Sequence, residues 1–387
     1  MGVEHILVGK RILGLFLNSE IRTGGHRRYL ELMEDLADRG HQVYVVLNET
    51  LDYEPQSFTA LRFQAQYVRR GFPPASSVFK AALKTHLSEL QNLAPEWILI
   101  HGETHLPAAA WLKKKLGCRL LFGIRSNVVR WSSIAMRESL RRPAAFLSAL
   151  KEHLIYRGYE HLAARSADVL VFQSTYDRDD FQSRVGAIQG RPVVIGGNIG
   201  GPRFSIDYAG VNHSTFLRKI LFVGTLGERK GLRYLVEALG ILAEHGVKGL
   251  ALDVLGPGEG QDRFLAMAER YGVGDAIRFH GRVADPFPYY RDADLLVVPS
   301  LFDSYPDTVL EALHVGVPVI ASRTGGISDQ LVFDELLIPI RDAEALAVAL
   351  ESLAKDSVAY MHIRELCASR RAAFDFDWAA AWEAELL

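Results

Sequence analysis

Short apolar runs rich in β-branched residues recur along the whole chain, and segments with helical patterning separate them. Six runs fall in each half: residues 12–17, 42–47, 97–100, 119–124, 168–172 and 192–195, then 219–223, 251–255, 277–280, 295–299, 318–321 and 336–340. Continuous apolar runs are typical of parallel strands buried on both faces, and their alternation with helices indicates βαβ units. Twelve strands suit two sheets of about six. The pattern predicts an α/β protein with two doubly wound parallel-sheet domains.

The boundary between the two sets of runs is a glycine-rich stretch with little periodicity, residues 196–216. We therefore predict a first domain over residues 1–200, a linker over 201–216 and a second domain over 217–370. The closing segment, 371–387, has the pattern of a helix with an apolar face, for which the first domain is a candidate packing surface.

The composition and the short length of the apolar runs exclude several classes of protein. The formal net charge of −2 gives no reason to expect nucleic-acid binding. Cys118 and Cys367 are too few for a disulfide framework. Lys10 and Arg11 interrupt the first apolar run, which is therefore not a secretory signal, and no run approaches the 18 or so residues that a membrane span needs. The expected location is the cytoplasm.

Ligands of open α/β sheets bind outside the carboxyl ends of the strands, so the loops that follow strands are the places to search. Gly24 and Gly25 follow the first predicted strand and begin a helix. Glycines there let backbone N–H groups approach a phosphate at the positive end of a helix. A plain tight turn uses the same pair of residues, so both interpretations stay open.

Arg229 and Lys230 occupy a glycine-flanked loop after the first strand of the second half, directly before a helix. Two cations there would neutralise a diphosphate, and Lys suits this as a compact point charge. The alternative is a solvated pair of surface cations.

The stretch FDSYPDTVLEALHVGVPVIAS, residues 302–322, places two carboxylates, Asp303 and Glu311, at the start of a predicted helix that leads into a strand. Asp303 and Ser304 are expected to cap that helix, with Pro306 in its first turn.

The same helix offers two kinds of ligand contact. Free backbone N–H groups at Asp307 and Thr308 would hold an anion such as phosphate. Glu311 lies two turns after Asp303 on about the same face, and its carboxylate would accept hydrogen bonds from the vicinal hydroxyls of a ribose. A surface helix glutamate is the alternative.

Other strand-end loops carry weaker signals. Residues 280–283 follow a strand and offer backbone groups to a base, and residues 323–331 contain a second glycine pair before a helix. The glycines of 255–261 do not match the dinucleotide-binding fingerprint, because Gln261 stands where its third glycine belongs. His, Cys and acidic residues show no zinc spacing, so no metal site is predicted.

Taken together, these stretches resemble the retaining nucleotide-sugar glycosyltransferases of the GT-B fold, glycosyltransferase family 4 (glycosyltransferase group 1). The most specific likeness is to the family's E-x7-E region with its Gly-Gly loop: DADLLVVPSLFDSYPDTVLEALHVGVPVIASRTGGISD. Supporting likenesses to its first loop, the strand before its linker, its lysine loop and its closing helix lie in TGGHRRYLELMEDLADRGHQVYVVL, SADVLVFQS, FVGTLGERKGLRYLVEAL and FDWAAAWEAEL.

The resemblance implies two Rossmann-like domains that face each other across a cleft, the first binding the acceptor and the second the donor. It implies a catalytic set in which Lys230 and Arg229 bind the donor diphosphate, Asp303 contacts the sugar hydroxyls and Glu311 holds the ribose. The further donor contacts that it implies are Gly24, Gly25, Gly224, Thr225, Gly281, Arg282, Val283, Ser304, Tyr305, Asp307 and Thr308.

The chain departs from the family pattern at three positions. Asp303 stands where Glu is usual, and Thr225 where a phosphate-binding Arg is usual, a loss for which Arg229 is the substitute. Arg125 occupies the place of a His in the first domain and cannot act as a base at neutral pH. His105 is the nearest replacement, so Arg125 and His105 are the acceptor-side candidates.

The implied activity is hexosyl transfer from a nucleoside diphosphate sugar to a glycan, lipid-linked or small-molecule acceptor, with retention of configuration and without a metal or other cofactor. Polysaccharide biosynthesis is the expected context. A nucleotide-sugar epimerase of the same fold and a non-catalytic nucleotide- or sugar-binding protein are the alternatives.

Residues 69–74 and 136–165 combine cations with apolar residues. A basic amphipathic helix can lie on an anionic membrane, so we expect weak peripheral contact with its inner face. A solvated helix face is the alternative.

Overall fold

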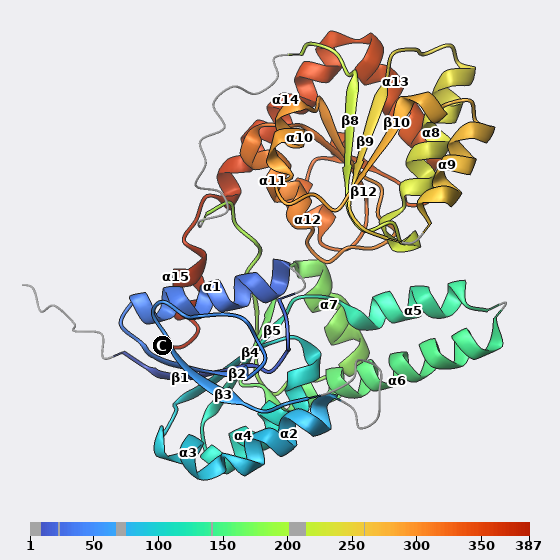
Figure 1. Ribbon diagram of the computed structural model, residues 1–387. Helices are drawn as coiled ribbons and strands as arrows, with labels where there is room; N and C mark the ends of the chain where they lie inside the picture. Colours follow the sequence, from blue (N-terminus) through green and yellow to red (C-terminus); the bar gives the residue numbers. More distant parts are fainter. Residues whose placement is uncertain (1–8, 22–23, 67–74, 141, 201–213, 259) are drawn as a thin grey trace, which may run out of the picture. The chain divides into compact units, whose positions relative to one another are not determined.

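The computed structural model describes residues 9–21, 24–66, 75–140, 142–200, 214–258 and 260–387. Most of the predicted linker and the basic segment at 69–74 lie outside these residues. The chain divides into two compact units, the first made of Met1–Gly196 and Trp378–Leu387, the second of Gly197–Asp377. Each unit is built around one parallel sheet (Figure 1).

The first unit contains a seven-stranded sheet in the order β3-β2-β1-β4-β5-β6-β7. Every neighbouring pair is parallel. Its strands are β1 (Arg11–Phe16), β2 (Gln42–Asn48), β3 (Thr59–Phe63), β4 (Trp97–His101), β5 (Arg119–Ile124), β6 (Val169–Phe172) and β7 (Arg191–Val194).

Helices cover both faces of this sheet. They are α1 (Gly24–Asp38), α2 (Ala75–Thr85), α3 (Leu87–Asn92), α4 (Leu106–Leu116), α5 (Val128–Glu138), α6 (Pro143–Ser166), α7 (Thr175–Val185) and α15 (Trp378–Glu383), with the short 3₁₀ turn η1 (Glu103–His105) after β4. In Figure 1, α1 and α15 lie on one side of the sheet, α2 and α4 lie on the other, and α5 runs beside α6.

The residues of β4 show why both faces are covered. Trp97 and Leu99 pack in the core beneath α1 and α15, whereas Ile98 and Ile100 pack in the core beneath α2 and α4. Alternation of side chains along a strand produces this division, and apolar residues at every position produce two cores. The last residues of the chain complete the first core, because Trp97 Nε1 donates to the Leu386 carbonyl at 3.0 Å.

The second unit contains a six-stranded sheet in the order β10-β9-β8-β11-β12-β13, again with parallel pairs. Its strands are β8 (Lys219–Val223), β9 (Ala251–Leu255), β10 (Ile277–Gly281), β11 (Leu295–Val298), β12 (Val319–Ser322) and β13 (Leu337–Ile338).

The helices of the second unit form two groups in Figure 1. One group contains α8 (Leu232–Glu244), α9 (Gln261–Arg270) and α13 (Ala343–Lys355). The other contains α10 (Phe287–Asp292), α11 (Asp307–Val315), α12 (Ile327–Leu331) and α14 (Ser357–Arg371). The fold class is therefore as predicted: each unit is a doubly wound, Rossmann-like parallel sheet.

Two details of the predicted strands were wrong. The prediction of six strands in the first half omitted β3, whose residues Thr59–Phe63 are mostly exposed or half-buried because it is an edge strand. The run at 336–340 was predicted as a full strand, but only Leu337–Ile338 pair with β12, since a 3₁₀ turn occupies the preceding residues.

Candidate functional site

The order in which the chain adds strands to the second sheet reverses between β8 and β11. These two strands are neighbours in the sheet but far apart in sequence. The loops that leave such a pair of strands diverge to opposite faces and make room for a ligand between them. Here the loops are joined directly, because Leu301 N donates to the Arg229 carbonyl at 2.8 Å. Gly231 permits this approach: its φ is +70°, and a Cβ there would lie 1.9 Å from the Pro299 carbonyl oxygen.

Lys230 and Asp303 meet at this junction. Lys230 Nζ donates to Asp303 Oδ2 at 2.5 Å, and the two side chains are only 15% and 14% exposed. Arg229 Nη1 lies 3.4 Å from the same carboxylate oxygen and donates to the Phe302 carbonyl at 3.0 Å. The stem of Lys230 runs past Gly224, where a Cβ would already be 3.4 Å from Lys230 Cδ. Two cations therefore converge on one carboxylate at the switch point.

The Asp303 carboxyl has a pKa below its ordinary value. Burial alone would raise the pKa, but the charges of Lys230 and Arg229 outweigh that effect and lower it. The Asp303 backbone is also held in place, because its carbonyl accepts from Gly326 N at 3.1 Å. Gly325, with φ of +54°, leaves space for that carbonyl, since a Cβ would lie 2.0 Å from it. The glycine pair noted in residues 323–331 thus supports the loop that carries Asp303.

The expectation that Asp303 and Ser304 cap α11 was wrong. The helix begins at Asp307, and the N-cap position belongs to Pro306, whose backbone is extended at φ −66° and ψ 123°. No side chain in the described parts of the chain caps this helix end. Asp303 instead lies on the loop before the helix and contacts Lys230. The N–H groups of the first turn, at Asp307 and Thr308, remain suited to an anion.

Glu311 is buried, with 8% of its surface exposed. Tyr290, on α10, donates its hydroxyl to Glu311 Oε2 at 2.6 Å, which orients the carboxylate. Sequence reasoning missed Tyr290, because the contact joins positions 21 residues apart on two different helices. In the sequence, the aromatic residues around Tyr290 indicate only a position in the core.

The other predicted residues of this unit lie on the same loops with different exposures. Ser304 is buried, Tyr305 is half-buried and Thr225 is exposed. The Thr308 hydroxyl is buried and has no hydrogen-bond partner among the described residues. Such an unpaired hydroxyl at a helix N-terminus suits a ligand oxygen.

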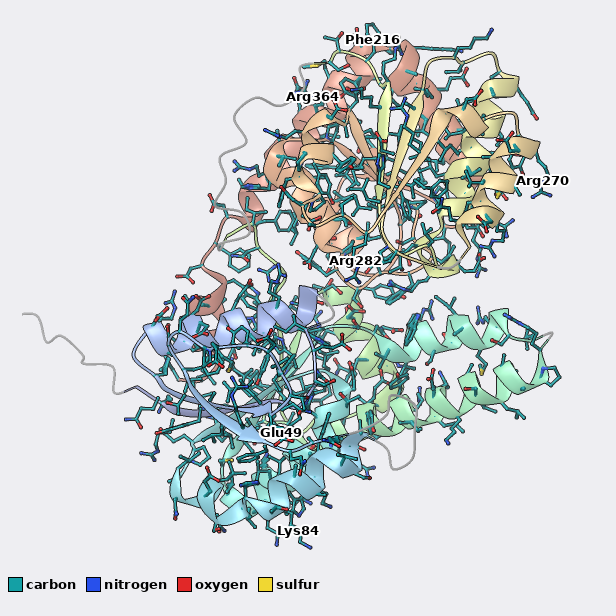
Figure 2. All side chains as sticks on the ribbon, in the orientation of Figure 1. Glu49, Lys84, Phe216, Arg270, Arg282 and Arg364 are labelled. Atoms are coloured by element: carbon teal, nitrogen blue, oxygen red, sulfur yellow. The ribbon has the colours of Figure 1, made fainter. Side chains whose placement is uncertain are left out.

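The loop after β10 contains the remaining three predicted contacts. Gly281 adopts a positive φ of +64°, and its carbonyl accepts from Gly256 N at 2.7 Å. Arg282 is exposed, and Figure 2 labels its side chain on this loop. Val283 packs partly against the core of the unit. The carboxyl ends of β8 and β10 thus each carry predicted residues.

In the first unit, Gly24 and Gly25 form the start of α1, as predicted. His105 lies in η1 and is 2% exposed, with Nε2 accepting from Leu17 N at 3.1 Å and its ring stacked on Phe79. Burial lowers the pKa of His105 to about 3, so its imidazole is neutral. Its hydrogen bond therefore fastens the loop after β1 to η1.

Arg125 follows β5 and is partly buried. With the Gln173 amide oriented to satisfy both of its groups, the amide oxygen accepts from Arg125 Nη1 at 3.0 Å. Burial lowers the pKa of His101, and the charges of Arg125 and Arg28 lower it further. Arg125 thus lies near Gln173 and His101, whereas His105 contacts Leu17 and Phe79.

Within the described residues, no group of three or more His, Cys, Asp or Glu side chains is arranged to hold a metal ion. At the switch point of the second unit, Lys230 and Arg229 contact the Asp303 carboxylate, and the nearby Asp307 carboxylate also acts on it. The two cations and the N-terminus of α11 are groups of the kind that bind polyanions.

Two protein-family models match the chain, one in each unit. The model described as "Glycosyl transferase 4-like domain" matches residues 23–197, and the model described as "Glycosyl transferases group 1" matches residues 217–356.

Curated relatives match over different lengths. A glycogen synthase of Mycobacterium tuberculosis is 26% identical over 381 residues, which cover 92% of this chain and 88% of that protein. A D-inositol 3-phosphate glycosyltransferase of Corynebacterium glutamicum is 33% identical over 174 residues, 42% of this chain and 40% of the relative.

Solved structures agree in fold. Sucrose-phosphate synthase of Thermosynechococcus elongatus superposes with a TM-score of 0.74 at 22% identity, covering 97% of this chain and 98% of the other. Anabaena HepE, solved with UDP and glucose, gives a TM-score of 0.69 at 17% identity over the same shares of the two chains. At these identities the likeness supports the GT-B fold.

Proposed function

The chain belongs to the group 1 glycosyltransferases, and on this premise we propose that it moves a hexosyl unit from a nucleoside diphosphate sugar to a glycan or lipid-linked acceptor. The sugar keeps its anomeric configuration, and no metal ion takes part. The C-terminal unit holds the donor and the N-terminal unit holds the acceptor.

The observation that carries this proposal is the convergence of Lys230 and Arg229 on Asp303 at the switch point of the second sheet. A diphosphate carries the charge that these two cations are placed to neutralise. The first turn of α11 supplies backbone N–H groups and the positive end of a helix for the same group. Glu311, held by Tyr290, supplies a buried acceptor for ribose hydroxyls.

Charge development in the reaction gives these residues their roles. As the bond between the sugar and the diphosphate breaks, negative charge grows on the leaving phosphate oxygen. Lys230, Arg229 and the helix N–H groups stabilise that charge, and each such donor contributes roughly 3 kcal/mol to lowering the barrier. Asp303 then contacts the sugar hydroxyls or remains with Lys230 as its counter-charge.

Retention follows if the acceptor attacks from the face that the diphosphate leaves. Relatives support a glycan acceptor: one is named a glycogen synthase and another, of Rhizobium meliloti, a lipopolysaccharide core biosynthesis glycosyltransferase. The solved HepE complex with UDP-glucose supports a sugar nucleotide as the donor.

A donor screen tests the proposal. The full chain is incubated in EDTA with UDP-, GDP- and ADP-sugars, first alone and then with glycan acceptors, and the products are followed by proton NMR. We expect one donor to be hydrolysed slowly and transferred faster, with the anomeric configuration of the donor in the product. Conversion of the donor sugar without an acceptor would indicate an epimerase, and binding without turnover would indicate a binding protein.

We further propose that α6 contacts an anionic lipid surface. None of the described helices is long and apolar enough to cross a bilayer. Leu147 and Leu154, seven residues apart, are 63% and 61% exposed, and Ile155 is 42% exposed. The exposed cations Arg142 and Lys151 lie on the same helix or at its start. Apolar side chains flanked by cations suit the headgroup region of an anionic membrane, where a lipid-linked acceptor would be found.

A further inference from the structure

The first unit contains a small pocket beyond the carboxyl ends of β4 and β5. Polar residues of its lining are Glu103, just after β4, Asn127, after β5, and Glu160 and Arg184, on α6 and α7. The apolar part of the lining includes Phe122, Tyr159 and Phe181. The free volume is about 20 Å³, and a space of roughly 10–15 Å³ is enough for one water-sized group. The pocket therefore fits a single small group rather than a whole sugar ring.

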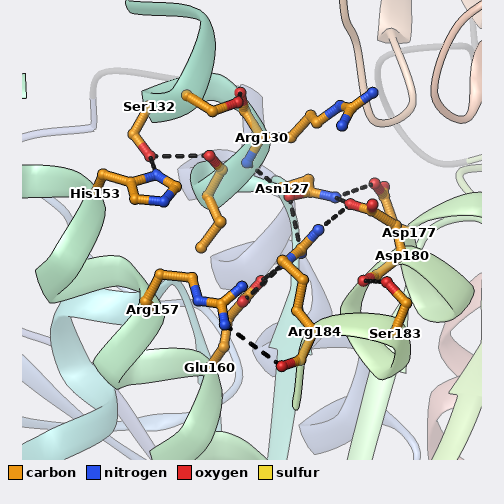
Figure 3. Close-up of polar contacts among 12 residues, drawn as sticks. Asn127, Arg130, Ser132, His153, Arg157, Glu160, Asp177, Asp180, Ser183 and Arg184 are labelled. Carbon is orange, nitrogen blue, oxygen red and sulfur yellow. Dashed lines mark hydrogen bonds and ion pairs between the residues drawn. The ribbon is translucent and has the colours of Figure 1, made fainter. Parts of the chain in front are cut away.

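One wall of the pocket is an ion-pair network, drawn in Figure 3. Arg184 donates from Nε to Glu160 Oε2 at 2.9 Å, from Nη2 to Asn127 Oδ1 at 3.2 Å, and from Nη1 to Asp180. Asn127 Nδ2 donates to Asp180 Oδ2 at 2.6 Å and to Asp177 Oδ1 at 3.2 Å. These groups satisfy one another and join α6 to α7 and to the loop after β5. The network is thus a rigid wall.

Glu103 differs from that wall. The residue as a whole is partly exposed, but its Oε1 atom has no accessible surface and no hydrogen-bond partner among the described residues. Burial, with a smaller contribution from the nearby Glu160 charge, raises the pKa of Glu103 to about 7. A buried acceptor oxygen without a partner is costly, and a rotation of the Glu103 carboxyl towards a donor group in the pocket would remove that cost.

The charges and aromatic side chains around the pocket indicate which kind of ligand group fits. An anion would meet the carboxylates of Glu160, Asp177 and Asp180, which outnumber Arg184. A metal ion would need more ligands than the described residues bring together there. A hydroxymethyl group suits both parts of the pocket, because its carbon contacts the aromatic lining and its hydroxyl can donate to a carboxyl oxygen.

We propose that this pocket receives the hydroxymethyl group of a sugar acceptor and that the Glu103 carboxyl, which lines the pocket, accepts the hydrogen bond of its hydroxyl. Glu103 is then a binding residue that selects acceptors with a free primary hydroxyl on the sugar ring. This assignment rests on the proposed function, since it concerns the acceptor of that transfer.

The test uses the full chain, the donor found in the screen, and six acceptors. These are the methyl glycosides of glucose, galactose and mannose, each beside its 6-deoxy analogue. We expect the wild-type protein to use the best parent glycoside with a kcat/KM about tenfold or more above that of its 6-deoxy analogue, because a site built to bond a hydroxyl rejects the compound that lacks it.

Variants at Glu103 connect the preference to this residue. Glu103→Leu removes the acceptor oxygen and should abolish the preference, whereas Glu103→Gln retains an acceptor oxygen and should keep it. Glu89→Leu, on an exposed glutamate of α3, is the matched control and should change nothing. Donor hydrolysis by Glu89→Leu should equal that of the wild-type protein, and urea unfolding should show that both Glu103 variants are folded.

Three results would overturn the assignment. The first is equal use of parent and 6-deoxy acceptors by the wild-type protein. This result would mean that the pocket holds only a water molecule, and it can be observed without any variant. The second is an unchanged preference in a Glu103→Leu variant that urea unfolding shows to be folded. The third is a wild-type protein that hydrolyses the donor but glycosylates none of the hexosides. Absence of any donor turnover would instead refute the proposed function itself.

Discussion

Lys230 Nζ lies 2.5 Å from Asp303 Oδ2, although the two residues are 73 positions apart in the sequence. The pair connects the loop after β8 to the loop after β11. Sequence reasoning assigned the two residues to different parts of a donor, the diphosphate and the sugar. Their contact means that a bound diphosphate competes with Asp303 for the same ammonium group, so the two roles are coupled.

Lys230→Ala should lower kcat by roughly 10²–10³-fold, the range seen when one preorganised donor is removed from a charge-stabilising site. The measurement is the turnover of the donor identified in the screen. Lys219→Ala is the matched control, because Lys219 is at the start of β8 and pairs with the exposed Asp292. Near-normal turnover in Lys230→Ala would contradict the role of this residue.

Asp303→Asn should destabilise the protein at neutral pH by about 1–3 kcal/mol, because it leaves Lys230 and Arg229 without their counter-charge. Since the folded-state pKa of Asp303 lies below its ordinary 3.8, its stabilising effect is present above that value and is lost as the pH falls through the lowered pKa. Urea unfolding of both proteins between pH 7 and pH 3 measures this effect. A difference that grows towards pH 3 would contradict the assigned sign.

Glu311→Leu, which removes the acceptor oxygens, should weaken binding of the nucleoside diphosphate about tenfold or more and should remove the distinction between that nucleotide and its 2′,3′-dideoxy analogue. The reason is that Glu311 is the acceptor assigned to the ribose hydroxyls, and a hydrogen bond to a charged group contributes roughly 1.5–3 kcal/mol. Calorimetric titration of both proteins with both nucleotides measures the coupling. The nucleotide affinity of Tyr290→Phe, which lacks the hydroxyl that orients Glu311, should lie between those of the wild-type protein and the Glu311 variant. Equal affinity of the wild-type protein for both nucleotides would refute the ribose contact.

Most of the fold was predictable because parallel strands buried on both faces leave continuous apolar runs in the sequence. Strand β6, Val169–Phe172, has all four residues buried and was predicted within one residue. The edge strand β3 was not predictable in this way, because only Phe63 of its five residues is buried. An edge strand exposes part of its surface and so loses the signal.

Sequence patterns indicated candidate site residues but not the contacts between them. Strand-end position and glycine flanks indicated Lys230, and Asp303 was chosen as a carboxylate before a helix. Their ion pair depends on β8 and β11 being neighbours in the sheet. The N-cap prediction failed because Pro306, with its extended backbone, holds the start of α11 at Asp307. Glu103 was missed although it directly follows a strand. The missing hydrogen bond that distinguishes Glu103 can be recognised only in three dimensions.

Exchanging Leu147 and Leu154 together for Gln should abolish co-flotation with vesicles that contain phosphatidylglycerol, because it removes the exposed apolar surface of α6. The wild-type protein should bind these vesicles weakly, less at high salt, and should not bind phosphatidylcholine alone. Val348→Gln, at a valine of α13 that is 65% exposed, is the matched control. If the wild-type protein never floats with the vesicles, this helix face is simply solvated. If the wild-type protein forms dimers that the double variant does not form, the face binds a second copy of the chain.

The most direct test of the central claim is calorimetric titration of the full chain with UDP-, GDP- and ADP-sugars in EDTA. The account predicts that one donor binds once per chain, with an affinity in the usual substrate range of about 1 μM to 1 mM, and that Lys230→Ala weakens this binding. Failure of every donor to bind the wild-type protein would contradict the assignment of the second unit as a nucleotide-sugar site.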